Sequence, residues 1–215
     1  MILDADSKIL YLYFQLSSEP PILITKQERK NKMKVFLPKN INKTIATIVS
    51  VDEFVENIEG IKNGSFNVIS IRSSDGRMGQ DKLKKYDLID EAKFKDICIG
   101  IFDDLQKESD RNTKTMIFPE EKHIFPILEW AKNKWNENHK PFVVHCTAGI
   151  SRSSAIAIVI NKMIRDNVKD AFNSDLHWPN KEILRLGEKF LGANDIVKQV
   201  EEKLKKESRI GDVSF

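Results

Sequence analysis

The stretch that decides the fold joins two apolar runs through a short polar loop. It reads Pro141-Phe142-Val143-Val144-His145-Cys146-Thr147-Ala148-Gly149-Ile150-Ser151-Arg152-Ser153-Ser154-Ala155-Ile156-Ala157-Ile158-Val159-Ile160. The first apolar run has the length and composition of a buried strand, and the second predicts a buried helix. The loop between them, with a glycine at its centre, is therefore expected at the start of that helix.

This loop has the composition of an anion-binding site. Backbone N–H groups of a tight loop and of a helix N-terminus point at one spot, where they favour negative charge. A sulfur atom at that spot, such as that of Cys146, is stabilised as a thiolate, which is the nucleophilic form of cysteine. Arg152 lies across the loop and supplies a planar guanidinium that can bind two phosphate oxygens. The loop thus predicts a thiolate beside a socket for phosphate.

Other apolar segments alternate between the spacing of strands and that of helices. Strands are predicted at 45–51, 66–71 and 95–102, and helices at 52–61, 120–135, 153–165, 180–191 and 195–207. This alternation favours an α/β domain with a central, largely parallel sheet flanked by helices. Ligands bind such sheets at the carboxyl ends of the strands, where the Cys146 loop and the loop beginning at Asp103 should both lie.

Composition limits the class of protein. The 215 residues, 40% apolar and 31% charged, suit one main domain at 41–215 with an extension at 1–40. A net charge of +3 is too small for a typical nucleic-acid binder and mildly favours anionic substrates. No apolar run approaches the ~20 residues that span a bilayer, and the first residues are acidic, unlike a signal peptide. With two cysteines, Cys98 and Cys146, and no disulfide framework, we expect a cytoplasmic protein without membrane or nucleic-acid partners.

The residues from His145 to Ser153 resemble the signature of the cysteine-dependent protein tyrosine phosphatases. That signature is His-Cys-x-x-Gly-x-x-Arg-Ser/Thr, and every fixed position is present in this chain. The resemblance covers about residues 44–191 and is closest to dual-specificity and bacterial members, whereas residues 1–40 have no counterpart. It implies the protein tyrosine phosphatase fold, with residues 41–215 as the phosphatase catalytic domain.

The resemblance also assigns roles to residues. Cys146 would be the nucleophile, Arg152 would hold the phosphate, and Ser153 would stabilise the thiolate as it leaves the phosphoenzyme. His145 would orient the loop and help to keep the thiol ionised, while Asn180, in a Pro-Asn pair, would bond to the loop region. Ser153 and Asn180 could equally be helix N-caps, and His145 a buried structural histidine. The phosphate-binding residues would be Cys146, Thr147, Ala148, Gly149, Ile150, Ser151 and Arg152.

A general acid must protonate the leaving oxygen. Members of the family take it from an aspartate on a separate loop upstream of the cysteine. Here a predicted strand ends in Phe102-Asp103-Asp104-Leu105, and its Phe-x-Asp-Leu arrangement resembles that of bacterial members. Asp104 is the first candidate, with Asp103 and Asp110 as alternatives. Each of the three could instead be a solvated loop carboxylate.

The variable positions of the loop bear on the substrate. None of them is charged, whereas members that act on inositol lipids often carry lysines there. We therefore expect a phosphorylated protein as substrate, with phosphotyrosine and also phosphoserine or phosphothreonine accepted. No cofactor or metal is expected, because no His/Asp cluster has ligand spacing. Alternatives are a catalytically weak phosphate-binding module, or a phosphatase for RNA 5′ ends or phosphoinositides.

The second cysteine, Cys98, falls in a predicted strand shortly before Asp103. In some relatives a second cysteine forms a disulfide with the oxidised nucleophile. The strand of Cys98 differs from the usual position of that partner. We therefore expect Cys98 to be an ordinary buried cysteine.

Overall fold

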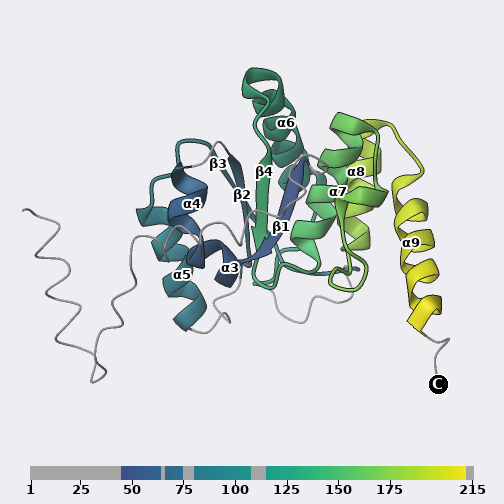
Figure 1. The fold of residues 1–215 in the computed structure, drawn as a ribbon, viewed down its shortest axis with the longest axis horizontal. Helices are drawn as coiled ribbons and strands as arrows, with labels where there is room; N and C mark the ends of the chain where they lie inside the picture. Colours follow the sequence, from purple (N-terminus) through teal and green to yellow (C-terminus); the bar gives the residue numbers. More distant parts are fainter. Residues whose placement is uncertain (1–44, 64–65, 75–79, 108–114, 212–215) are drawn as a thin grey trace, which may run out of the picture. The chain divides into compact units, whose positions relative to one another are not determined.

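The computed structural model of the protein describes residues 45–63, 66–74, 80–107 and 115–211, and side chains as far as residue 207. Within these residues the strands form one parallel sheet in the order β1-β4-β2-β3 (Figure 1). The strands are β1 (Ala46–Ser50), β2 (Asn67–Arg72), β3 (Ile97–Ile101) and β4 (Phe142–Cys146). The predicted α/β class with a parallel sheet is confirmed.

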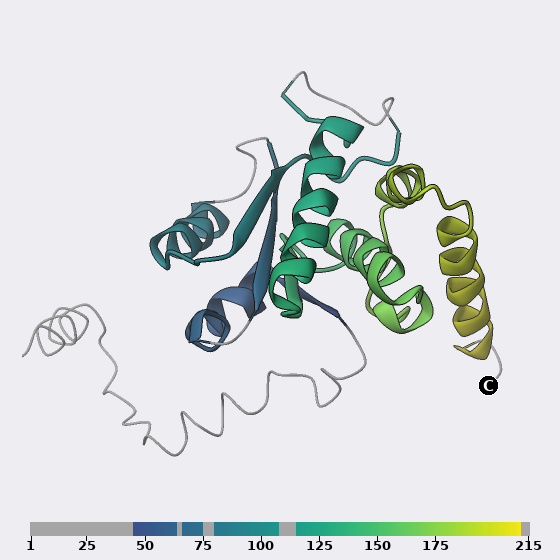
Figure 2. The ribbon, with the colours of Figure 1, turned by 90° about the horizontal axis from the view of Figure 1, so that it is seen from above.

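Helices cover both faces of this sheet (Figure 1; Figure 2). One face carries α3 (Val51–Glu56), α4 (Ile58–Asn63) and α5 (Gln80–Glu91). The other carries α6 (Glu121–Asn138), α7 (Arg152–Arg165) and α8 (Lys181–Leu191), with the 3-10 helix η2 (Lys169–Ala171) between α7 and α8 in the chain. Helix α9 (Ile196–Gly211) packs against α8. No helix among the described residues is long and apolar enough to cross a lipid bilayer.

The stretch quoted at the outset forms the centre of this domain. Strand β4 lies between β1 and β2, and all five of its residues are buried. Helix α7 is buried from Arg152 to Asn161 and packs against both β4 and β1. A helix that is apolar nearly all round is stable only when it is enclosed. Burial therefore determines where β4 and α7 lie in the domain. The loop between them is held at the carboxyl edge of the sheet.

On the face of the sheet covered by α3, α4 and α5, the helices differ from those predicted from the sequence. The helix expected at 52–61 is two short helices, α3 and α4, and Asn57 between them donates its backbone N–H to Phe54 O over 3.2 Å. Helix α5 was not predicted, because only Tyr86 and Ile89 of its twelve residues are buried and its apolar spacing is weak. The predicted extension at 1–40 lies outside the described residues, so the division into domains stays a prediction.

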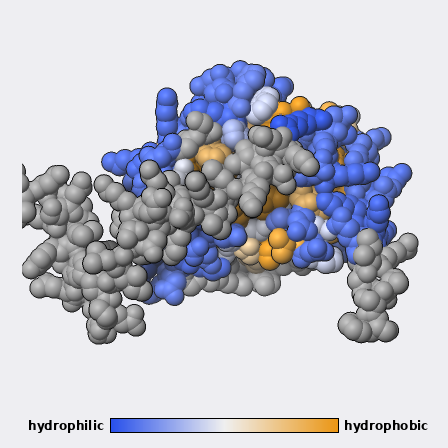
Figure 3. All heavy atoms as spheres, in the orientation of Figure 1, coloured by the Kyte–Doolittle hydropathy of each residue, from blue (hydrophilic) through white to orange (hydrophobic). Residues whose placement is uncertain are grey.

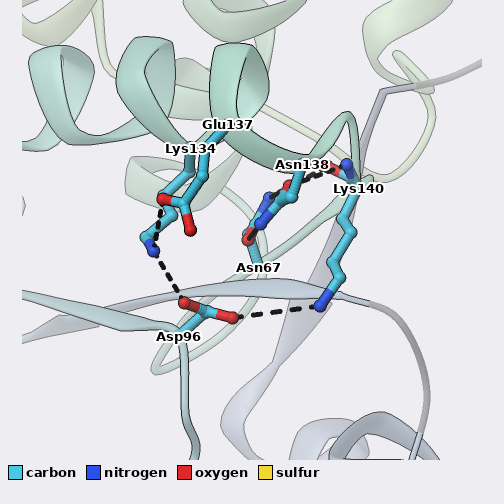
Figure 4. Close-up of polar contacts among 6 residues, drawn as sticks. All are labelled: Asn67, Asp96, Lys134, Glu137, Asn138 and Lys140. Carbon is cyan, nitrogen blue, oxygen red and sulfur yellow. Dashed lines mark hydrogen bonds and ion pairs between the residues drawn. The ribbon is translucent and has the colours of Figure 1, made fainter.

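The edge of the sheet opposite the loop is closed by a polar cluster (Figure 4). Asn67 and Asn138 exchange two amide hydrogen bonds of 3.2 and 3.1 Å. The carboxylate of Asp96 forms ion pairs with two lysines: its Oδ1 lies 2.8 Å from Lys134 Nζ and its Oδ2 lies 3.9 Å from Lys140 Nζ. The hydrogen bond from Lys134 is the main reason why the pKa of Asp96 is lowered. The cluster ties the start of the strands to the end of α6, away from the candidate site.

Candidate active site

The loop after β4 has a backbone that only glycine permits at its centre. Gly149 has a φ of +73°. A Cβ atom at this position would lie 2.6 Å from Ser50 N and 2.8 Å from the carbonyl carbon of Val49. Both atoms belong to the backbone of β1, so they could shift only if the strand itself were distorted. The fixed glycine of the motif therefore lets the loop turn tightly against the end of β1.

Cys146 is the last residue of β4 and is 2% exposed. Its Sγ lies 3.2 Å from the hydroxyl of Ser153, which is fully buried in the first turn of α7. The N-cap position of α7 is held by Ser151, so the Ser153 hydroxyl is available to the sulfur. A hydroxyl at this distance can donate a hydrogen bond to a thiolate. The pair is arranged as expected for a nucleophile and the group that stabilises it.

Arg152 is almost fully buried, yet its guanidinium is only partly paired. Its Nη1 donates to Phe102 O over 2.8 Å and to Ser73 Oγ over 3.0 Å, while Nη2 donates to Thr147 Oγ1 over 3.2 Å. Its Nε is buried and has no hydrogen-bond partner among the described residues. A buried, charged donor without an acceptor is unfavourable, and an oxygen atom of an anionic ligand would satisfy it.

The structure brings Asp104 to the loop. Asp104 is exposed, and its Oδ1 accepts hydrogen bonds from Ser151 Oγ at 2.7 Å and from Asn180 Nδ2 at 2.8 Å. Asn180 is fully buried as the N-cap of α8, where its Oδ1 accepts from Ile183 N over 3.1 Å. The Asn180 amide also donates to Leu105 O over 3.1 Å. Asn180 thus caps its helix and holds the Asp104 segment beside the loop.

Asp103, the neighbouring candidate, has a different environment. It is 3% exposed and accepts hydrogen bonds from Ser74 N at 3.2 Å, from Ser74 Oγ, and from Ile117 N at 2.7 Å. These donors occupy both carboxylate oxygens and join three segments of chain. Asp103 is thereby positioned to fix the loop that carries Asp104. The third candidate, Asp110, lies outside the described residues.

His145 is fully buried beneath the loop. Its ring centroid lies 4.4 Å from that of Phe54, and neither ring nitrogen has a hydrogen-bond partner among the described residues. Burial, aided by the charge of Arg72, lowers the pKa of His145 to about 3. The imidazole is therefore neutral at neutral pH. In this state His145 brings no positive charge to the loop, and its ring packs against those of Phe54 and Tyr86.

Two residues near the loop were missed in the sequence. Tyr86 of α5 places its hydroxyl 3.4 Å from Thr147 Oγ1, and burial is the main reason why its pKa is raised. Arg72 lies over the Tyr86 ring, 5.1 Å from its centroid, and is held by Asp90 through hydrogen bonds of 2.9 and 2.6 Å. Arg72 ends β2 at the carboxyl edge, so the same edge argument that selected Cys146 could have found it. Tyr86 lies in the helix that was not predicted.

Cys98 is far from Cys146. It pairs with Ile69 of β2, which on its other side pairs with Val144 of β4, so two strand spacings separate β3 from β4. At about 4.8 Å per strand this exceeds the ~7 Å limit for a disulfide between Cα atoms. Burial raises the pKa of Cys98 to about 11, so this half-buried thiol is protonated at neutral pH. These properties fit an ordinary structural cysteine.

The donors at the loop suit an anion. The first turn of α7 carries several hydrogen-bond donors. They are Arg152 Nε, the Ser153 hydroxyl and the backbone amides at the start of the helix. The Asp104 carboxylate lies at the same loop, where it accepts a hydrogen bond from Ser151 Oγ. In the described part of the chain no group of three or more His, Cys, Asp or Glu side chains gathers as metal ligands would. A tetrahedral oxyanion is the ligand that these donors can satisfy.

Comparison with known proteins supports this interpretation of the loop. Residues 109–176, which include the whole signature, match the family model described as protein-tyrosine phosphatase. The match confirms the resemblance to the cysteine-dependent protein tyrosine phosphatases. The matched segment contains β4, the loop and α7. No curated protein matches the chain.

Solved structures of protein tyrosine phosphatase-like proteins are also similar to the chain. Tk-PTP in its active form is 15% identical, with a TM-score of 0.36 over 76% of this chain and 95% of that chain. The human tyrosine phosphatase-like serine/threonine/tyrosine-interacting protein is 14% identical, with a TM-score of 0.45 over 68% and 91%. PTPMT1 in complex with PI(5)P is 10% identical, with a TM-score of 0.43 over 74% and 93%.

Proposed function

We propose that the protein is a dual-specificity phosphatase that hydrolyses phosphotyrosine, and also phosphoserine and phosphothreonine, in phosphorylated proteins. The observation that carries this proposal is the position of Asp104, which Ser151 and Asn180 hold against the loop of Cys146. A module that only binds phosphate needs a socket but no acid. A carboxyl group fixed beside the socket supplies the proton that turnover requires.

In the first step the phosphate group of the substrate binds to Arg152 and to the amides of the loop. The Cys146 thiolate attacks phosphorus, so that an S–P bond forms and the bond from phosphorus to the substrate oxygen breaks. The protonated carboxyl of Asp104 transfers its proton to that oxygen, which leaves as a neutral alcohol or phenol. The guanidinium and the loop amides stabilise the charge on the transferred phosphoryl oxygens.

In the second step a water molecule attacks the cysteinyl phosphate. The Asp104 carboxylate, now deprotonated, accepts a proton from that water as the new P–O bond forms. The S–P bond breaks and the electron pair returns to sulfur. The hydroxyl of Ser153, at 3.2 Å, donates to the departing thiolate and makes it a better leaving group. Inorganic phosphate is released and the enzyme returns to its starting state.

The substrate class follows from the side chains that the loop presents. Thr147, Ala148, Ile150 and Ser151 offer no charge for the additional phosphates of an inositol polyphosphate. A monoester with a single phosphate, such as a phosphorylated protein side chain, needs no further cation. We therefore favour protein substrates over phosphoinositides and RNA 5′ ends. The cytoplasmic location stays a prediction.

Hydrolysis of p-nitrophenyl phosphate and phenyl phosphate by purified variants tests the proposal. Cys146→Ser should abolish turnover of both. Asp104→Asn should lower kcat for phenyl phosphate, whose leaving group is poor, by about 10²–10⁴-fold, and far less for p-nitrophenyl phosphate. Asp96→Asn is the matched control, because Asp96 pairs with Lys134 at the opposite edge of the sheet, and its loss should lower stability without this dependence on the leaving group. Equal rates for wild type and Cys146→Ser would contradict the proposed activity.

A further inference from the structure

Three large apolar side chains are exposed next to the loop that would bind phosphate. Ile150 is 43% exposed, Leu176 62% and Trp178 65%. The Trp178 backbone N–H donates to Ile150 O over 3.1 Å, so the two backbones are direct neighbours. Figure 3 shows residues of high hydropathy at the surface among hydrophilic ones in its lower middle. We call these three residues the apolar ledge.

The segment that carries the ledge is firmly braced. Leu176 N and His177 N both donate to Asn173 O, over 3.2 and 2.9 Å, and Asn173 N donates to His177 Nδ1 over 3.0 Å. At its other end Asn180 N donates to Ser151 O over 3.3 Å. Leu176 and Trp178 are therefore held out to solvent by an ordered turn. A preorganised apolar surface binds a partner with a small additional loss of entropy.

Charge distinguishes the kinds of partner that the ledge can take. No lysine or arginine occurs from residue 172 to residue 180, whereas Asp175 lies in the same turn. Asp104 contacts Asn180 at the end of the turn, and both the Glu53 carboxylate and the Lys203 ammonium act on His177, while Lys203 Nζ also donates to Phe172 O over 2.5 Å. Charges of both signs therefore border the turn, which does not form the run of lysines and arginines that attracts an anionic lipid surface. An apolar side chain of a substrate peptide needs no such run.

We propose that the ledge binds an apolar side chain next to the phosphorylated residue of the substrate, and so selects among phosphoproteins. This inference rests on the proposed function. Ile150 belongs to the phosphate loop, and the hydrogen bond from Trp178 N to Ile150 O joins the segment of Leu176 and Trp178 to that loop. Because Ile150 belongs to the phosphate loop itself, the residues that flank the phosphorylated one are the part of a bound peptide that would contact the ledge. Burial of that side chain against the ledge raises affinity.

Two phosphotyrosine peptides test this, identical except that the residues flanking phosphotyrosine are leucine in one and serine in the other. Wild type should favour the leucine peptide in kcat/KM by about tenfold, which corresponds to about 1.4 kcal/mol. The difference should lie in KM. Leu176→Ala and Trp178→Ala should each reduce the preference to about threefold or less. Leu88→Ala, at a similarly exposed leucine of α5 (47%), should leave the preference unchanged.

The same peptides are also titrated against Cys146→Ser, which measures the preference by binding without turnover. Equal affinity for both peptides, or a preference that survives both ledge variants, would overturn the ledge. Failure of wild type to hydrolyse p-nitrophenyl phosphate would instead overturn the proposed function, because that substrate has no flanking residues. Co-sedimentation with phosphatidylserine vesicles that is lost in Leu176→Ala and Trp178→Ala would show a lipid surface as the partner and overturn the peptide proposal.

Discussion

Replacing Asn180 tests how the acid segment is joined to the phosphate loop. In Asn180→Ala the α8 N-cap loses its acceptor for Ile183 N, and the donor to Asp104 and Leu105 O disappears. An N-cap contributes about 1 kcal/mol, and each buried hydrogen bond contributes about 1 kcal/mol. The free energy of unfolding should therefore fall by about 3 kcal/mol. Asp104 would also lose one of the two donors that orient it.

Asn180→Ser separates these effects, because the new hydroxyl can still cap α8 but replaces the amide that donates to Asp104 and Leu105 O. Urea unfolding gives the stability of each variant, and the ratio of kcat for p-nitrophenyl and phenyl phosphate reports on the acid. Both variants should lose rate mainly with phenyl phosphate. Asn133→Ala, at an exposed position of α6, should change stability by at most about 0.5 kcal/mol. A loss below about 1 kcal/mol in Asn180→Ala, with an unchanged leaving-group ratio, would refute the bridging role.

Three further predictions follow from single residues. Gly149→Ala should lower both the thermal midpoint and the turnover of p-nitrophenyl phosphate, because the new methyl group meets the β1 backbone, whereas Gly60→Ala, with open space around its Cβ, should do neither. Arg152→Lys should lower kcat at least about 100-fold in steady-state assays while thermal unfolding shows a folded protein, since lysine cannot bind two oxygens in one plane. Asp96→Asn should lower the thermal midpoint at pH 7. Because the pKa of Asp96 is lowered by Lys134, its contribution is complete above the ordinary value of 3.8 and is lost as the pH falls through the lowered pKa, so melts of the two proteins should converge in acid.

The strand, loop and helix around Cys146 could be predicted because burial and a motif indicate the same structure. The residues from Phe142 to Val144 and from Ala155 to Ile160 are buried, as their apolar composition predicts. The carboxyl-edge rule then placed Asp104 near this loop. These conclusions depend on local composition and on the general geometry of parallel sheets.

Other parts of the site depend on contacts between distant segments, which local composition does not reveal. Asp103 and Asp104 are adjacent and chemically identical, yet Asp103 is buried against Ser74 and Ile117 while Asp104 is exposed at the loop. Both follow the end of β3 at Ile101, so which of them faces the loop is decided by the contacts that this segment makes with distant residues. Tyr86 could not be assigned for a related reason, because its helix buries too few residues to leave a periodic signal.

The most direct test of the central claim is the capture of the phosphoenzyme. Wild type and Asp104→Asn are mixed with p-nitrophenyl phosphate, quenched in acid within the first turnovers, digested and examined by mass spectrometry. We predict a phosphoryl group on Cys146, more abundant in Asp104→Asn, because the group that activates water for the second step is missing. Turnover without a phosphoryl group on Cys146, or with that group on another residue, would contradict the account.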